Sequence, residues 1–145
     1  MLKDPSDCTM CTLDHLRKAT RAVALITDAA LAPVQLKSTQ FSLLVTLDKC
    51  GDIALGQLAK VLVMERTTLT RNIKPLIAKG LVIRKIEQDK RLRILSITEQ
   101  GKLALQMAQP LWREAQLNLV GKFGTGRWSD LLDDLNFLTK EAQKL

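Results

Sequence analysis

Apolar side chains recur along most of the chain with the three- and four-residue spacing of amphipathic helices. The first stretch predicts a long helix over about residues 12–32 that stops near Pro33. A second helix is predicted from Ser38 or Thr39, either of which can cap its N-terminus, to Gly51. The apolar face of this second helix is expected to carry Phe41, Leu44, Val45 and Leu47.

Two shorter helical patterns follow, separated by only three residues, 63–65. The first has apolar side chains at positions 55, 58, 59 and 62. The second is expected to bury Leu69, Ile73, Leu76 and Ile77, with Gly80 in the position after its end. Two short helices joined by a tight turn are typical of a helix-turn-helix.

The period of the apolar pattern changes after Gly80. Residues 81–86 and 92–97 are rich in β-branched and aliphatic side chains and flank a polar segment, which predicts a hairpin with a charged tip. From Thr98 a helical pattern returns to about Val120, and a sixth helix is predicted after the glycine-containing break at 121–126. The predicted fold is mainly α with a small β-hairpin wing: a winged helix-turn-helix in a single domain, residues 1–145.

Several functional classes are disfavoured by the sequence. No apolar run approaches the roughly 20 residues of a membrane span, and the acidic N-terminus is unlike a secretory signal, so we expect a cytoplasmic protein without membrane contact. His15 is the only histidine, and neither a glycine-rich phosphate loop nor a G-x-S-x-G motif is present. We therefore expect neither an enzyme nor a cofactor.

The positive charge is concentrated in the middle of the chain. The net charge is +7, and residues 52–96 hold ten Lys and Arg against four Asp and Glu, a net of +6. A basic, ordered segment favours a polyanionic partner, although a solvated basic surface would give the same count. Aromatic residues are only 3% of the chain and Tyr is absent, which argues against stacking on single-stranded bases and favours double-stranded DNA.

The outward face of the fourth predicted helix carries hydrogen-bond donors and small methyl-bearing hydroxyls but no acid after Glu65. Such side chains suit base edges, thymine methyl groups and phosphates in a major groove, so we expect sequence-specific binding. An architectural protein that binds DNA without sequence preference is the alternative. The predicted DNA-binding residues of this helix are Arg66, Thr67, Thr68, Thr70, Arg71 and Lys74.

Residues 63–101 resemble the signature region of the MarR family of bacterial transcription regulators. The run RTTLTR, the following KGLV, the D-K-R of the wing and the T-E-Q-G before the next helix match in order and spacing. The resemblance implies a homodimer in which residues 12–32 and 99–145 form the dimerisation helices, while 36–97 form the DNA-binding region. It also implies that two recognition helices enter successive major grooves of a pseudo-palindromic site.

Residue by residue, the resemblance implies base or phosphate contacts from Thr67, Thr68, Thr70 and Arg71. It implies a minor-groove contact from Arg91, with Lys90 beside it. Asp89 matches the acid of the family's wing, which pairs with the arginine and braces the loop. A lone carboxylate facing DNA would repel phosphate, so a bracing role also agrees with electrostatics.

The segments after the wing carry more apolar surface than one small winged domain can cover, so a partner surface is expected. The alternative is that these helices fold back on their own domain. The apolar positions in question are Leu103, Met107, Leu111, Trp112, Leu117, Val120, Leu131, Leu135 and Leu138.

Two sequence features concern regulation. Cys8 and Cys11 form a C-x-x-C at the start of the first helix, where a thiol pair can act as an oxidation switch, although two thiols without a sensing role are equally compatible with the sequence. With His15 the pair is one ligand short of a tetrahedral zinc site, so no metal is expected. Cys50 is expected to be a small packing residue. The resemblance implies a repressor released by a small molecule, such as a phenol or carboxylate, bound between the dimerisation helices and the winged domain.

Overall fold

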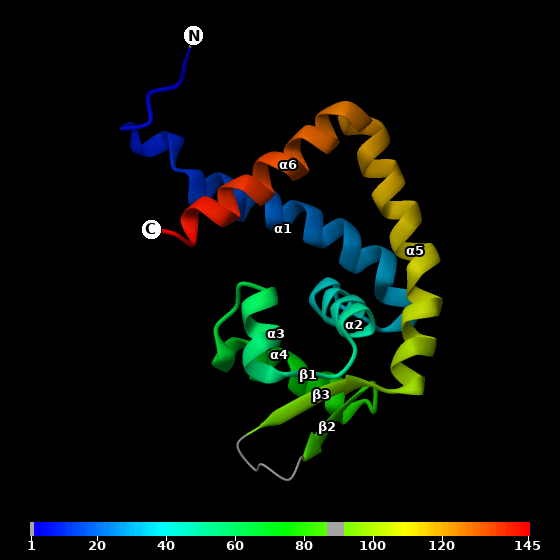
Figure 1. Cartoon of the computed structure of the whole chain (residues 1–145). Coiled ribbons are helices and arrows are strands. Elements are labelled where there is room, and N and C mark those ends of the chain that lie inside the picture. The colour runs from blue at the N-terminus through cyan, green and yellow to red at the C-terminus, as the bar shows by residue number, and fades with distance from the viewer. Residues whose placement is uncertain (1, 87–91) are drawn as a thin grey trace.

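The computed structural model describes residues 2–86 and 92–145. An arm of three helices adjoins a smaller part that holds the helix-turn-helix and the wing: two of the helices lie above this part, and the third, α5, runs down one side of it (Figure 1). The arm consists of α1 (Thr12–Leu31), α5 (Glu99–Phe123) and α6 (Thr125–Ala142). The smaller part consists of α2 (Ser38–Cys50), α3 (Leu55–Val61), α4 (Arg66–Ala78) and the strands β1 (Ile53–Ala54), β2 (Val82–Ile86) and β3 (Arg93–Ile97). The 3-10 turns η1 (Cys8–Met10) and η2 (Ala32–Val34) flank α1. The predicted mainly helical fold with a small wing is confirmed.

The N-terminus of α2 is capped differently from the prediction. Ser38 is the first helical residue, Lys37 is the N-cap position, and neither Ser38 nor Thr39 caps the helix with its side chain. The Lys37 amide donates to Gln40 Oε1 at 3.0 Å, and the Ser38 amide donates to Asp28 Oδ1 at 2.6 Å. Asp28 lies in α1, so a side chain of the arm satisfies an amide of the smaller part.

The hydrophobic core lies where α2, α3, α4 and the sheet meet the C-terminal end of α1 and the N-terminal half of α5. In α2 the prediction was right for Phe41, Leu44 and Leu47 but wrong for Val45, which is 38% exposed while Leu43 is buried instead. The Phe41 ring stacks on Trp112 of α5, with 5.6 Å between ring centroids. The fully buried side chains are Leu31, Leu44, Leu47, Leu58, Leu69, Ile73, Leu76, Val82 and Leu95.

The sheet has three antiparallel strands in the order β1-β3-β2. The predicted hairpin is formed by β2 and β3, with Val82 opposite Ile97 and Ile86 opposite Arg93. The two-residue strand β1 was not predicted; it places Ile53 opposite Leu95. The third strand connects the middle of β3 to the start of α3, which follows β1 directly.

The T-E-Q-G segment joins the wing to α5 by close packing. Thr98 caps α5 by accepting a hydrogen bond from the Gly101 amide at 3.0 Å, and its hydroxyl donates to the Gly80 carbonyl at 2.6 Å. A Cβ at Gly101 would overlap the Leu81 carbonyl and come within 2.6 Å of Ile97 Cγ1. Glycine is therefore required at this position for close approach rather than for backbone freedom.

The arm leaves much apolar surface uncovered within one protomer. In α6 no residue is buried, and α5 continues to Phe123, so the chain breaks only at Gly124 rather than over 121–126. Among the described residues, no helix is both long and apolar enough to cross a membrane. The exposed large apolar side chains of the arm include Leu13, Val23, Leu25, Ile26, Leu103, Met107, Leu117, Leu131, Leu132, Phe137 and Leu138.

Candidate nucleic-acid interface

The turn between α3 and α4 is closed by backbone hydrogen bonds. The Val63 amide donates to the Lys60 carbonyl at 3.1 Å, and the Met64 amide donates to the Ala59 carbonyl at 2.9 Å. Val63 has a φ of 52°, in the left-handed region that β-branched residues rarely adopt. The tight turn therefore stores some backbone strain.

The inward face of α4 is fixed by its apolar side chains, as predicted. Leu69, Ile73 and Leu76 are fully buried, and Ile77 is half-buried. The i, i+4, i+7 spacing then places Thr67, Arg71 and Lys74 together on the opposite, exposed face. Thr68 lies on one flank of this face and is half-buried.

The other flank of α4 faces a groove of about 770 Å³ between α3 and the wing. Arg66, Thr67 and Thr70 line it from α4. Three polar residues that were not singled out from the sequence line it from the other elements: Gln57 and Lys60 of α3, and Arg93 of β3. Lys60 and Arg93 were counted only in the basic segment, because nothing local in the sequence places them beside α4.

Hydrogen bonding inside α4 limits what Thr70 can offer a ligand. Its hydroxyl donates to the Arg66 carbonyl at 2.8 Å. The hydroxyl proton is thus used within the helix, and the Thr70 methyl group and oxygen lone pairs remain for contacts.

Two cations of the basic segment are engaged in contacts within the protein. Lys79 donates to the Gln35 carbonyl at 2.8 Å, which connects the end of α4 to the loop before α2. Lys85 of β2 forms an ion pair with Asp52 at 2.8 Å across the sheet. Hydrogen bonds from Lys85 and Ser96 hold the pKa of the Asp52 carboxyl below its usual range. The predicted wing residues Asp89, Lys90 and Arg91 lie outside the described residues.

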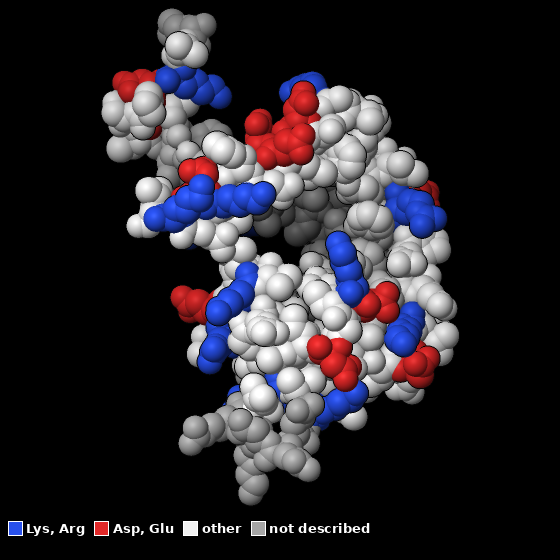
Figure 2. All heavy atoms as spheres, in the orientation of Figure 1, with Lys and Arg blue, Asp and Glu red and all other residues white. Residues whose placement is uncertain are grey.

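Figure 2 shows the distribution of charge on one face of the molecule: acidic side chains gather over α6 in the arm, whereas basic and acidic side chains lie side by side on the smaller part below it. The acids of α6 include Asp130, Asp133 and Asp134. The basic excess of this part is therefore seen in the count over residues 52–96, a net of +6, which suits a polyanion that approaches from the side of α4 and the wing.

The chain is similar to a known protein family and to solved structures. The MarR family model matches residues 36–92, which span the helix-turn-helix and the first strand of the hairpin, β2. The structure of the M. tuberculosis transcriptional regulator MosR in complex with DNA is similar over 92% of this chain and 97% of that chain, with a TM-score of 0.84 and 34% sequence identity. This chain belongs to the MarR family. It is thereby a member of a family of DNA-binding transcriptional regulators.

One further structure agrees with this assignment, and a second agrees with the fold. The transcriptional repressor CouR bound to a 23-mer DNA duplex has a TM-score of 0.81 at 25% identity, covering 96% of this chain and 99% of that chain. A mutant MarR from E. coli complexed with operator DNA has a TM-score of 0.76 at 21% identity, covering 97% of this chain and 99% of that chain, and supports the fold alone. No curated protein matches by sequence.

In this MarR-family protein the N-terminal thiols lie on an exposed 3-10 turn. Asp7 caps the turn by accepting from the Thr9 amide at 2.8 Å, and the Cys11 amide donates to the Cys8 carbonyl at 3.3 Å. Cys8 and Cys11 are free and exposed, and so is Cys50, which was wrongly expected to pack. His15 Nδ1 lies 2.8 Å from the Cys11 carbonyl. Within residues 2–86 and 92–145, no group of three or more His, Cys, Asp and Glu side chains could hold a metal.

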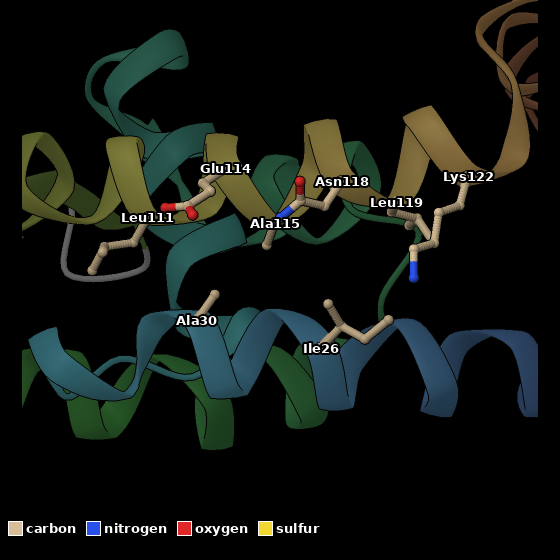
Figure 3. A pocket seen from close by; sticks show the side chains of 8 residues that line it. All are labelled: Ile26, Ala30, Leu111, Glu114, Ala115, Asn118, Leu119 and Lys122. Carbon is tan, nitrogen blue, oxygen red and sulfur yellow. The ribbon is translucent and has the colours of Figure 1, made fainter.

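Among the described residues, cavities separate α1 from other helices at two places. One, of about 470 Å³, separates α1 from α5, with Ile26 and Ala30 facing Leu111, Ala115 and Leu119 (Figure 3). The other, of about 530 Å³, lies between the arm and the DNA-binding part, where Figure 2 shows the molecule hollowed. It is lined mainly by apolar groups of α1, α2 and α6, with hydroxyls and one amide among them: Thr20, Thr27, Ser38, Thr39, Ser42 and Asn72.

Proposed function

We propose that this MarR-family regulator binds a pseudo-palindromic DNA site as a homodimer, inserts α4 of each protomer into a major groove, and acts as a repressor. The observation that carries the proposal is the exposed face of Thr67, Arg71 and Lys74, opposite the buried Leu69 and Ile73. Donors and methyl groups on a rigid helix can read base edges, which an architectural protein that binds only phosphates would not need. Because its family consists of transcription regulators, we do not expect the protein to be an enzyme. We place it in the cytoplasm, where its DNA lies.

The proposed DNA contacts divide between the two sides of α4. Thr67, Thr68, Arg71 and Lys74 lie on the face suited to base edges and groove walls, while Arg66 and Thr70 line the groove toward the wing. From the sequence we add Lys90 and Arg91 as minor-groove or phosphate contacts, with Asp89 bracing the wing. The folded unit is the whole chain, with residues 36–97 for DNA and the flanking helices for the dimer.

The dimer is supported by the uncovered apolar surface of the arm. No residue of α6 is buried, and its large apolar side chains Leu131, Leu132, Phe137 and Leu138 are exposed. Exposed apolar surface of this extent is unfavourable in water and marks a site of association. The cavity between α1 and α5 is open in one protomer, and we infer that side chains of the partner fill it. A homodimer has the two-fold symmetry that a pseudo-palindromic site requires.

We further propose that a phenolic or carboxylate effector occupies the cavity of about 530 Å³ between the arm and the DNA-binding part. Its apolar walls suit an aromatic ring, and its hydroxyls and the Asn72 amide suit the polar group of such a ligand. A ligand there contacts both parts and can shift their relative position. Titration with salicylate should raise the unfolding temperature and release DNA, and Ser42→Leu should weaken both effects.

A thiol switch is the second candidate for regulation. Cys8 and Cys11 are both exposed and belong to one 3-10 turn, so an oxidised thiol could be resolved by its neighbour. Peroxide should then release DNA from the native protein but not from the variant with Cys8→Ser and Cys11→Ser. Release that persists in this variant would leave the pair without a sensing role.

The experiment that tests the proposed function is selection of binding sites from a randomised duplex library by the purified protein. We expect an enriched pseudo-palindrome with half-sites one or more helical turns apart. Recovery of sequences without a shared motif would instead support an architectural role.

A further inference from the structure

Gly56 stands at the second position of α3, where its residue type has no backbone explanation. Positive φ values among the described glycines occur at Gly51, Gly80 and Gly124, and not at Gly56. Glycine inside a helix is less stable than alanine, because it loses more backbone entropy on folding. The backbone of Gly56 therefore does not require glycine, and the space left by the missing side chain is the feature to explain.

The missing side chain leaves room for the guanidinium of Arg66. A Cβ built on Gly56 would lie 2.7 Å from Arg66 Nη2, 3.1 Å from Cζ and 3.3 Å from Nε. All three nearest atoms belong to one planar group, so the guanidinium lies directly against the first turn of α3. Arg66 is the first residue of α4, and its side chain thus bridges the two helices of the helix-turn-helix.

The charge of Arg66 is directed at the DNA-binding groove. Gly56 and Arg66 line the groove between α3 and the wing together with Thr67, Thr70 and Arg93. Among residues 2–86 and 92–145, the ion pairs that form do not include Arg66. Its charge therefore remains available for an anion, and the groove lies beside the helix face proposed to read DNA.

We propose that Gly56 is a positioning residue for DNA binding, which by lacking a Cβ holds the Arg66 guanidinium against α3 and aims it at a backbone phosphate of the duplex. This inference rests on the proposed function. A side chain that is ordered before binding loses less conformational entropy when DNA arrives. Adding a Cβ would displace the guanidinium while leaving the fold intact, since the displaced atoms are the free end of a flexible side chain.

The test is a double-mutant cycle in the full-length protein, with wild type, Gly56→Ala, Arg66→Ala and the double variant. Fluorescence anisotropy would measure binding to the duplex from the promoter beside its own gene and to a random duplex, over a salt series. Gly121→Ala is the matched control, because a Cβ at Gly121 has nothing within 4 Å. Thermal unfolding of each variant would report on folding.

We expect Arg66→Ala to weaken binding to both duplexes by about tenfold, as for loss of a charged hydrogen bond. The slope of log affinity against log salt concentration should fall in magnitude by about one per protomer. Gly56→Ala should weaken both by roughly threefold or more through the same contact, while unfolding at or above the wild-type temperature. The double variant should bind no more weakly than Arg66→Ala, because both changes affect one interaction.

The inference would be overturned if Gly56→Ala bound DNA with wild-type affinity. It would also be overturned if the losses of affinity in the two single variants multiplied in the double variant, since Gly56 would then not act through Arg66. A loss confined to the promoter duplex would overturn the assignment of a phosphate contact. Failure of the proposed function is distinguished by the wild-type protein, which would then bind the promoter duplex no better than the random duplex. The Arg66 contact can still be measured in that case, by comparing the variants on the random duplex.

Discussion

Asp28 links the arm to the DNA-binding part, and its removal should destabilise the protein by a predictable amount. Its Oδ1 accepts from the Ser38 amide at 2.6 Å, at an N-terminus that has no side-chain cap of its own at Lys37. Loss of a helix cap costs about 1 kcal/mol, and loss of the negative charge at a helix N-terminus adds roughly 0.3–0.5 kcal/mol for a solvent-screened carboxylate. Asp28→Ala should therefore lower the free energy of unfolding by about 1–1.5 kcal/mol.

Asp28→Asn keeps an oxygen acceptor but loses the charge, so it should cost only about 0.5 kcal/mol. The backbone hydrogen bond from Ser38 holds the pKa of Asp28 below its ordinary value of 3.8. A carboxyl with a lowered folded-state pKa stabilises the protein fully above its unfolded pKa and ceases to do so as the pH falls through the folded value. The difference between wild type and Asp28→Asn should thus be constant near neutrality and disappear well below pH 3.8.

Urea denaturation followed by circular dichroism, at one protomer concentration because the protein is proposed to be a dimer, measures both effects. Asp14→Ala is the control: it removes an exposed ion pair with Lys18 at 2.7 Å and should change stability by under about 0.5 kcal/mol. The capping role would be refuted if Asp28→Ala had the same free energy of unfolding as the wild type. It would also be refuted if the difference in stability between wild type and Asp28→Asn persisted in acid.

Three further predictions concern the turn, the wing junction and the reading face. Val63→Asn should raise the free energy of unfolding by roughly 0.5–1 kcal/mol, because asparagine tolerates the left-handed φ of 52°; a destabilised variant would argue against strain in this turn. Gly101→Ala should lower the free energy of unfolding by about 1–3 kcal/mol, because the added Cβ overlaps its neighbours, whereas Gly121→Ala should not. Equal unfolding temperatures of the two variants would contradict this packing. Arg71→Ala should weaken binding to the selected site by about 1–3 kcal/mol, the value of a bidentate base contact, and binding to random duplex by less. Equal losses of affinity for the two duplexes, measured by anisotropy, would exclude base readout.

The sequence predicts the helices well because their apolar spacing is local. The starts and ends of α1, α3 and α4 follow from periodicity, from Pro33 and from Gly80, and the buried face of α4 follows from Leu69 and Ile73. The strand β1 is too short to have a period of its own, and it exists only because β3 lies beside it. Its position depends on tertiary contacts that a linear pattern does not contain.

The candidate site divides in the same way. The outward residues Thr67, Arg71 and Lys74 are fixed by the helical repeat of α4 itself. The groove residues Gln57 and Arg93 come from elements that meet only in the folded chain. The cap of α2 by Asp28 is likewise invisible in the sequence, because the carboxylate reaches Ser38 from another helix.

The central claim is that two copies of this chain read one DNA site through α4. Its most direct test is fluorescence anisotropy of the purified protein on the duplex from the promoter beside its own gene, with random duplex as competitor, over a salt series and at stoichiometric concentrations. The account predicts tight binding that resists the competitor and saturates at two protomers per site. Binding that random duplex removes equally well, or saturation at one protomer, would contradict it.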